Sequence, residues 1–183
     1  MLAQLDLLYD NGDMSKSWLA ALLIGTGVLF ILMAAGYAVH LGRIDRIEPA
    51  PLPGDIAGMS LSGQVLGAPA LAELSWMHGQ DFQLNRGAVG SYGMGNEITL
   101  YVAGTPLRYT AARMISDMRD KIKQAETSFT PLGEREHGRR RIYELVGMGQ
   151  QHFYFRSGNL VIWLAVAGED AELVLQEALD FYP

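Results

Sequence analysis

The sequence predicts a small α+β domain that is joined to one N-terminal transmembrane helix. Residues 18–39 carry no charged side chain, and at ~1.5 Å per residue a helix of this length crosses a ~30 Å hydrocarbon core. After residue 67, short apolar runs alternate with Gly-rich turns, which is typical of strands joined by hairpins. Between these runs, an apolar stripe with helical spacing predicts one amphipathic helix. Together these patterns predict an antiparallel sheet of about five strands with helices packed on one face.

The chain divides into four segments. Residues 1–17 are a polar and apolar mixture that predicts either a frayed tail or a short interfacial helix. Residues 18–39 are the transmembrane helix, and residues 40–54 contain Pro49, Pro51 and Pro53. Such Pro-rich segments favour extended conformations, so this segment is expected to be a stiff stalk. Residues 55–183 are expected to form the α+β domain.

Within the domain, turn and cap signals give the order of the elements. A helix is expected from Ala68 to the stop at Gly79, and a hairpin from residues 87–92 and 97–103. Pro106 then begins a helix over residues 106–125, whose apolar stripe contains Leu107, Met114, Ile115, Met118 and Ile122. Three strands are expected at residues 141–146, 152–156 and 160–166, and a final helix after Asp170.

A shift of 62 residues aligns the second strand of the predicted hairpin with the last predicted strand, including Tyr101 with Trp163. Each of these strands is followed by a predicted helix. The pattern indicates either two related hairpin-plus-helix units or two amphipathic strands that align by chance.

The sequence lacks the residue patterns of common catalytic and metal sites. It has no Cys and only four His, with no pair at metal-ligand spacing, so neither a metal nor a haem site is expected. It contains no nucleophile-elbow, Ser-x-x-Lys or phosphate-loop motif. The predictions are therefore no enzymatic activity and no cofactor. The net charge of −6 argues against nucleic acid as a partner.

A basic cluster, Arg135 with residues 139–141, is interleaved with Glu134, Glu136 and Glu144. Mixed charges of this kind are ordinary at the edge of a sheet, so a solvated hairpin edge is expected. Contact with anionic headgroups or an acidic partner is the alternative interpretation.

Two sets of residues are candidates for binding. Ala21 and Gly25 lie four residues apart in the apolar segment, where small residues let another helix approach closely. Phe153, Tyr154 and Phe155 form the richest aromatic stretch. One alternate set of their side chains should face the core, and the other should be an exposed anchor for a partner protein. A second buried core is the alternative.

These observations predict a non-catalytic accessory subunit that docks onto integral membrane protein subunits and contacts the lipid bilayer. The alternative is a membrane-anchored sensor or small-ligand-binding module. Positive charges near the span, Lys16 before it and Arg43 and Arg46 after it, do not fix the orientation. A short Lys-bearing tail is typical of an uncleaved signal anchor, so an extracytoplasmic domain is expected.

Overall fold

The computed structural model describes residues 11–44, 46–78, 82–124 and 127–183. The chain forms two units, Met1–Asp45 and Arg46–Pro183. The first contains one helix, α1 (Asn11–Ile44), which includes the apolar segment Trp18–Val39. This is the one helix in the described part of the chain that is long and apolar enough to cross a membrane. Most of the tail predicted for residues 1–17 lies outside the described residues, and residues 11–17 form the start of α1.

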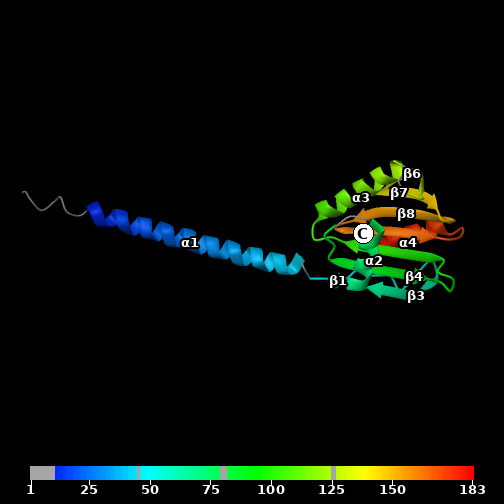
Figure 1. Ribbon diagram of the computed structural model, residues 1–183, viewed down its shortest axis with the longest axis horizontal. Coiled ribbons are helices and arrows are strands. Elements are labelled where there is room, and N and C mark those ends of the chain that lie inside the picture. Colours follow the sequence, from blue (N-terminus) through cyan, green and yellow to red (C-terminus); the bar gives the residue numbers. More distant parts are fainter. Residues whose placement is uncertain (1–10, 45, 79–81, 125–126) are drawn as a thin grey trace, which may run out of the picture. The chain divides into compact units, whose positions relative to one another are not determined.

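The second unit is one mostly antiparallel sheet with three helices (Figure 1). The strands are β1 (Glu48–Pro49), β2 (Asp55–Ile56), β3 (Met59–Leu66), β4 (Arg86–Tyr92), β5 (Ile98–Gly104), β6 (Thr130–His137), β7 (Arg140–Gly147), β8 (Gln150–Ser157) and β9 (Leu160–Val166). The helices are α2 (Ala68–His78), α3 (Arg108–Lys123) and α4 (Ala171–Phe181). The strand order is β2-β3-β4-β5-β9-β8-β7-β6, and β1 pairs in parallel with β4.

The α+β prediction is therefore correct in outline, but the sheet has nine strands in the described residues instead of about five. The hairpin β4–β5 and the strands β7, β8 and β9 are the five predicted strands. Four strands were not predicted. They are the short strands β1 and β2, and the strands β3 and β6 near the two edges of the sheet. Residues 130–132, which no predicted element included, belong to β6.

Helices cover both faces of the sheet, which corrects the prediction that they pack on one face. Successive side chains of a strand point to opposite faces. Leu100 of β5 packs in a buried cluster with α4, whereas its neighbour Tyr101 packs against the cluster that contains α2 and α3. The α4 face is also covered by the segment from Ala50 to Ile56, where both of these residues are buried.

The Pro-rich segment differs from the expected stalk. Helix α1 continues to Ile44, and the domain begins at Arg46. The hydroxyl of Tyr182 donates to the carbonyl oxygen of Pro51 at 2.6 Å, and that of Tyr92 donates to Pro53 at 2.9 Å. These hydrogen bonds and strand β1 hold residues 48–53 on the domain.

The predicted 62-residue repeat describes the two central strands. Strands β5 and β9 have the same length at this offset, and their register places Tyr101 directly opposite Trp163. The helices that follow do not obey the repeat, because α3 and α4 pack on opposite faces. The similarity therefore extends over the strands and not over the layers that cover them.

Candidate functional site

The predicted aromatic anchor is inside the domain. Phe153, Tyr154 and Phe155 are all buried, with at most 1% of each residue exposed. Strand β8 lies between β7 and β9, and both of its faces are covered at these positions. Phe153 and Phe155 pack in the cluster with α4, and Tyr154 packs in the cluster with α3. The expectation that one alternate set is exposed is therefore wrong, and the alternative of a second buried core describes these rings.

Tyr154 belongs to an aromatic cluster under α3 that consists of Phe129, Tyr143, His152, Tyr154 and Trp163. Tyr154 stacks between Tyr143 and Trp163, with ring centroids 4.6 and 5.3 Å away. Burial raises the pKa of the Tyr154 hydroxyl, which stays protonated at neutral pH. Stacked rings on adjacent strands contribute to packing, so the cluster has a structural role.

His152 is also buried, and its two ring nitrogens have different partners. Nε2 lies 3.0 Å from the carbonyl oxygen of Gly147, and Nδ1 accepts a hydrogen bond from the Trp163 indole at 3.1 Å. Because a carbonyl only accepts, Nε2 must carry the proton. Burial lowers the pKa of His152, although the Gly147 bond acts in the opposite direction. A neutral ring with both nitrogens bonded has no free position for a metal or a proton-transfer step.

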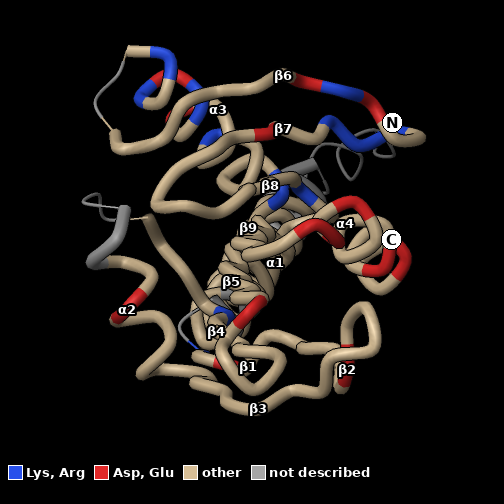
Figure 2. Tube along the Cα trace, turned by 90° about the vertical axis from the view of Figure 1, so that its right-hand side faces the viewer, with Lys and Arg blue, Asp and Glu red and all other residues tan. Residues whose placement is uncertain are grey.

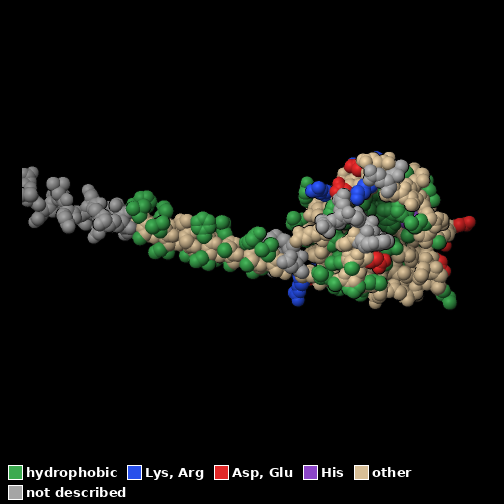
Figure 3. Space-filling model, in the orientation of Figure 1, with side chains coloured by type: hydrophobic (Ala, Val, Ile, Leu, Met, Phe, Trp, Pro, Cys, Tyr) green, Lys and Arg blue, Asp and Glu red, His purple; other side chains and the backbone are tan. Residues whose placement is uncertain are grey.

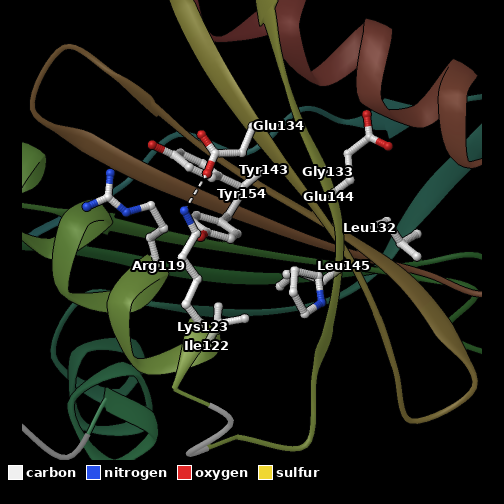
Figure 4. Close-up of a pocket in the computed structure, with 11 residues that line it drawn as sticks. Arg119, Ile122, Lys123, Leu132, Gly133, Glu134, Tyr143, Glu144, Leu145 and Tyr154 are labelled. Atoms are coloured by element: carbon white, nitrogen blue, oxygen red, sulfur yellow. Dashed lines mark ion pairs between the residues drawn. The ribbon is translucent and has the colours of Figure 1, made fainter.

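A pocket of about 200 Å³ lies between α3 and the strands β6 and β7 (Figure 4). Tyr143 and Tyr154 line it together with charged groups. Lys123 pairs with Glu134 at 3.2 Å, and Glu144 pairs with Arg135 at 2.7 Å. The pocket is smaller than the usual ~300–1,000 Å³ of small-molecule sites. A charged ligand would also have to replace existing ion pairs.

Within the described residues, no group of three His, Asp or Glu side chains is arranged to hold a metal ion. The basic cluster is distributed among separate structural contacts. Arg140 donates to the carbonyl oxygens of Leu179 and Tyr182 at the end of α4. Arg135 and Arg141 pair with glutamates of β6, β7 and α4. Of the four arginines, Arg139 is the one for which the described residues provide neither an ion pair nor a side-chain hydrogen bond.

The sheet has two different edges, which Figure 2 shows by charge. Strand β6 contains Pro131, a register shift after it, and the charged run 134–136. Proline, irregular register and charge all discourage pairing with another strand. Strand β3, at the other side, contains neither proline nor any charged residue. Its partner β2 covers only Met59 and Ser60, so residues 62–66 have no outer strand in the described part of the chain.

The hydrogen bonds of β3 identify which of its backbone groups point outward. The N–H of Gly67 donates to the carbonyl oxygen of Gly87 at 2.9 Å. In an antiparallel ladder, hydrogen-bonded pairs alternate with non-hydrogen-bonded pairs. From this register, the N–H and C=O groups of Gly63 and Val65 point toward β4 and pair with it. Those of Gln64 and Leu66 point away from β4. All residues from 62 to 66 are exposed.

We define residues 62–66 as the open edge. Sequence reasoning missed it because its residues are mostly small or polar and do not alternate clearly. The available signal was an uncharged, proline-free run between Gly58 and Gly67, both of which have positive φ angles typical of turns.

The predicted helix contact lies on α1. Ala21 and Gly25 are on the same side of the helix because they are four residues apart. Apart from its chain neighbours and the backbone of its own helix, no atom lies within 4 Å of a Cβ built on Gly25. Contact of this side of α1 with a second helix stays a prediction. Comparison with protein-family models, curated proteins and solved structures finds no match to this chain.

Proposed function

We propose that this chain is a non-catalytic, single-pass accessory subunit that docks onto a larger membrane protein complex. Helix α1 has the length and composition to anchor it. The observation that carries the docking proposal is the open edge, which offers unpaired backbone groups without charge or proline. The small pocket with paired charges supports a ligand-binding module less well.

The proposed contact of the domain is strand addition. An extended segment of an integral membrane subunit would lie along the open edge and pair with the outward N–H and C=O groups of Gln64 and Leu66. The contact of α1 would use the side that contains Ala21 and Gly25, where close approach of a second helix is sterically open.

A proline substitution tests the strand contact. In Gln64→Pro the outward N–H is lost, whereas the ladder to β4 keeps its hydrogen bonds because Gln64 does not donate to it. We expect this variant to fold but to lose part of its association with the large species in a blue-native gel after mild detergent extraction. Gln64→Thr, which keeps the N–H, is the matched control and should co-migrate with the complex as the wild-type chain does.

Two results would reject the proposal. One is a wild-type chain that migrates as a free species in native membranes. The other is a folded Gln64→Pro variant that remains fully in the complex.

We also propose that the domain lies outside the cytoplasm, because Lys16 directly before the apolar segment is typical of a signal anchor. Protease added to intact spheroplasts should then digest the domain. Digestion only after the membrane is broken would place the domain in the cytoplasm instead.

A further inference from the structure

The two ends of the sheet differ in charge. We call the end where β1 pairs with Arg86 of β4 the β1 end. The register places the end of β5, the start of β9 and the start of β7 at this same end. The loop before α3 and the turns at residues 138–139 and 158–159 therefore lie there. The turn at residues 93–97 and the loop before α4 lie at the opposite end.

Three exposed arginines are at the β1 end, namely Arg46, Arg108 and Arg139. The described residues form no ion pair with any of them. Three large hydrophobic residues at this end are also exposed: Ile47 (50%), Leu107 (52%) and Tyr109 (75%). Basic residues and exposed apolar residues are thus present together at one end of the domain.

Acidic residues at the β1 end have partners, and one of them, Glu136 at the end of β6, pairs with Arg141 at 3.4 Å. Glu48 pairs with Arg86 at 2.9 Å, and Asp180 accepts a hydrogen bond from Gln176 at 3.2 Å. The opposite end carries acidic residues in its turns and loops: Asp55, Glu97, Glu169 and Asp170. Figure 3 shows basic side chains at the end nearest β1 and an acidic side chain that projects from the opposite end.

The chain also enters the domain at the β1 end. The domain begins at Arg46, and the apolar segment of α1 ends at Val39. Residues 40–45 therefore tether this end, and not the acidic end, to the proposed membrane span.

We propose that the β1 end docks on anionic phospholipid headgroups of the bilayer that α1 spans. This inference depends on the proposed anchoring by α1 but not on the accessory-subunit proposal. Each basic residue near an anionic surface strengthens binding roughly fivefold, so Arg46, Arg108 and Arg139 together supply the attraction. A tether holds the surface close to the lipid, so a weak attraction is sufficient.

The test uses the full chain in lipid nanodiscs, with an environment-sensitive dye on a single introduced cysteine. The natural chain has no Cys, so the label is specific. One label replaces Tyr109 at the β1 end, and the other replaces Met94, which is fully exposed at the opposite end. Discs contain phosphatidylcholine alone or with about 30% phosphatidylglycerol, the anionic lipid.

We expect the Tyr109→Cys label to shift its emission to shorter wavelength only in anionic discs, and ~0.5 M salt should reverse the shift. The label at Met94→Cys should not respond to lipid composition. The double variant Arg108→Glu/Arg139→Glu should abolish the shift. The matched control, Glu169→Lys/Asp170→Lys at the opposite end, should leave it unchanged.

An identical Tyr109→Cys signal in both discs would overturn the docking inference, as would a lipid-dependent shift at Met94→Cys or one that survives the double arginine reversal. Carbonate extraction distinguishes this result from a failed anchor. Release of the chain from the membrane would overturn the proposed anchoring and the inference that depends on it. Retention without a lipid-dependent shift would overturn docking alone.

Discussion

Met148 occupies a backbone conformation that its side chain disfavours. It lies in the two-residue turn between β7 and β8, with a φ of 54° and 76% of the residue exposed. The following residue, Gly149, also has a positive φ of 76°. A turn with two positive φ angles between paired strands favours Asn-Gly, because Asn tolerates the left-handed region better than Met.

We therefore expect Met148→Asn to stabilise the domain by about 0.5–1 kcal/mol. Chemical denaturation of the detergent-solubilised chain measures the change. Met94→Asn is the control, because Met94 is also an exposed turn residue but does not have a positive φ. An equal gain at both positions would mean that removal of an exposed apolar side chain, and not backbone strain, causes the effect.

His152 should make stability depend on pH. Its pKa is lowered in the folded state, mainly by burial. As pH falls below the unfolded value of about 6.5, the unfolded chain binds a proton that the folded chain does not. Stability is therefore fully present above this pH and decreases as the pH falls, until the folded pKa is reached. The slope can approach ~1.4 kcal/mol per pH unit.

Thermal melting between pH 7 and pH 5 measures this loss, since carboxylates titrate mainly below this window. His152→Gln keeps a side-chain amide near Gly147 but cannot titrate, and it should remove most of the slope. The same slope in both proteins would assign the pH dependence to other groups.

At the scale of elements, α3 is held by a narrower set of side chains than its sequence pattern predicts. Ala111, Met114, Ile115 and Ile122 are buried, Met118 is half-buried, and Leu107 precedes the helix and is 52% exposed. The predicted stripe is therefore correct for its central residues. At its N-terminal end it is wrong, because the helix begins later and Leu107 extends toward solvent.

We expect Met114→Asp to destabilise the domain by more than ~3 kcal/mol, because an unpaired carboxylate would replace a fully buried side chain. Ala112→Asp, on the exposed side of the same helix, is the matched control and should change stability by less than about 0.5 kcal/mol. Urea denaturation followed by tryptophan fluorescence compares them. Similar stability of the two variants would show that α3 does not cover the core.

Whether a strand can be predicted from the sequence depends on how many of its side chains are buried. Strands β5, β8 and β9 have buried residues on both faces, so their apolar runs are visible without a structure. Strand β6 is exposed along almost all of its length and β3 along most of it. Their pairing depends on backbone hydrogen bonds, which leave no hydrophobic pattern in the sequence. The open edge belongs to such a strand, so hydrophobic periodicity did not reveal it, and the uncharged, proline-free run between Gly58 and Gly67 was its available signal.

The same limit applies to the aromatic residues. The sequence correctly indicates that one set of side chains in β8 is buried, but the second covering layer comes from segments far from β8 in the chain. Helix α4 packs over Phe153 and Phe155, and α3 over Tyr154. Alternation in a sequence indicates that a strand has two different faces. It does not indicate which segments of the chain cover each face.

At the scale of the whole molecule, two contacts in one chain would act together. The proposed helix contact at Ala21 and Gly25 and the proposed strand contact at the open edge belong to separate units joined by one chain. Once either contact forms, the other forms at a high effective concentration. Each contact can then be weak alone, while the pair holds the subunit in its complex.

This arrangement predicts a pattern among variants. Gly25→Leu obstructs helix approach in the unit that contains α1, and Gln64→Pro removes one outward donor in the other unit. Each single variant should retain part of the chain in the purified complex, and the double variant should retain almost none. Gly42→Leu, at a helical glycine outside the apolar segment and with equally open surroundings, is the control for Gly25→Leu and should behave as wild type.

The double variant also distinguishes one contact from two, because losses at independent contacts multiply in the equilibrium constant. If Gln64→Pro alone already removes the chain and Gly25→Leu has no effect, the domain edge alone binds the partner and α1 serves only as an anchor. If the reverse holds, the open edge has no part in docking. Measured melting temperatures close to the wild-type value in all variants would show that these losses reflect binding and not unfolding.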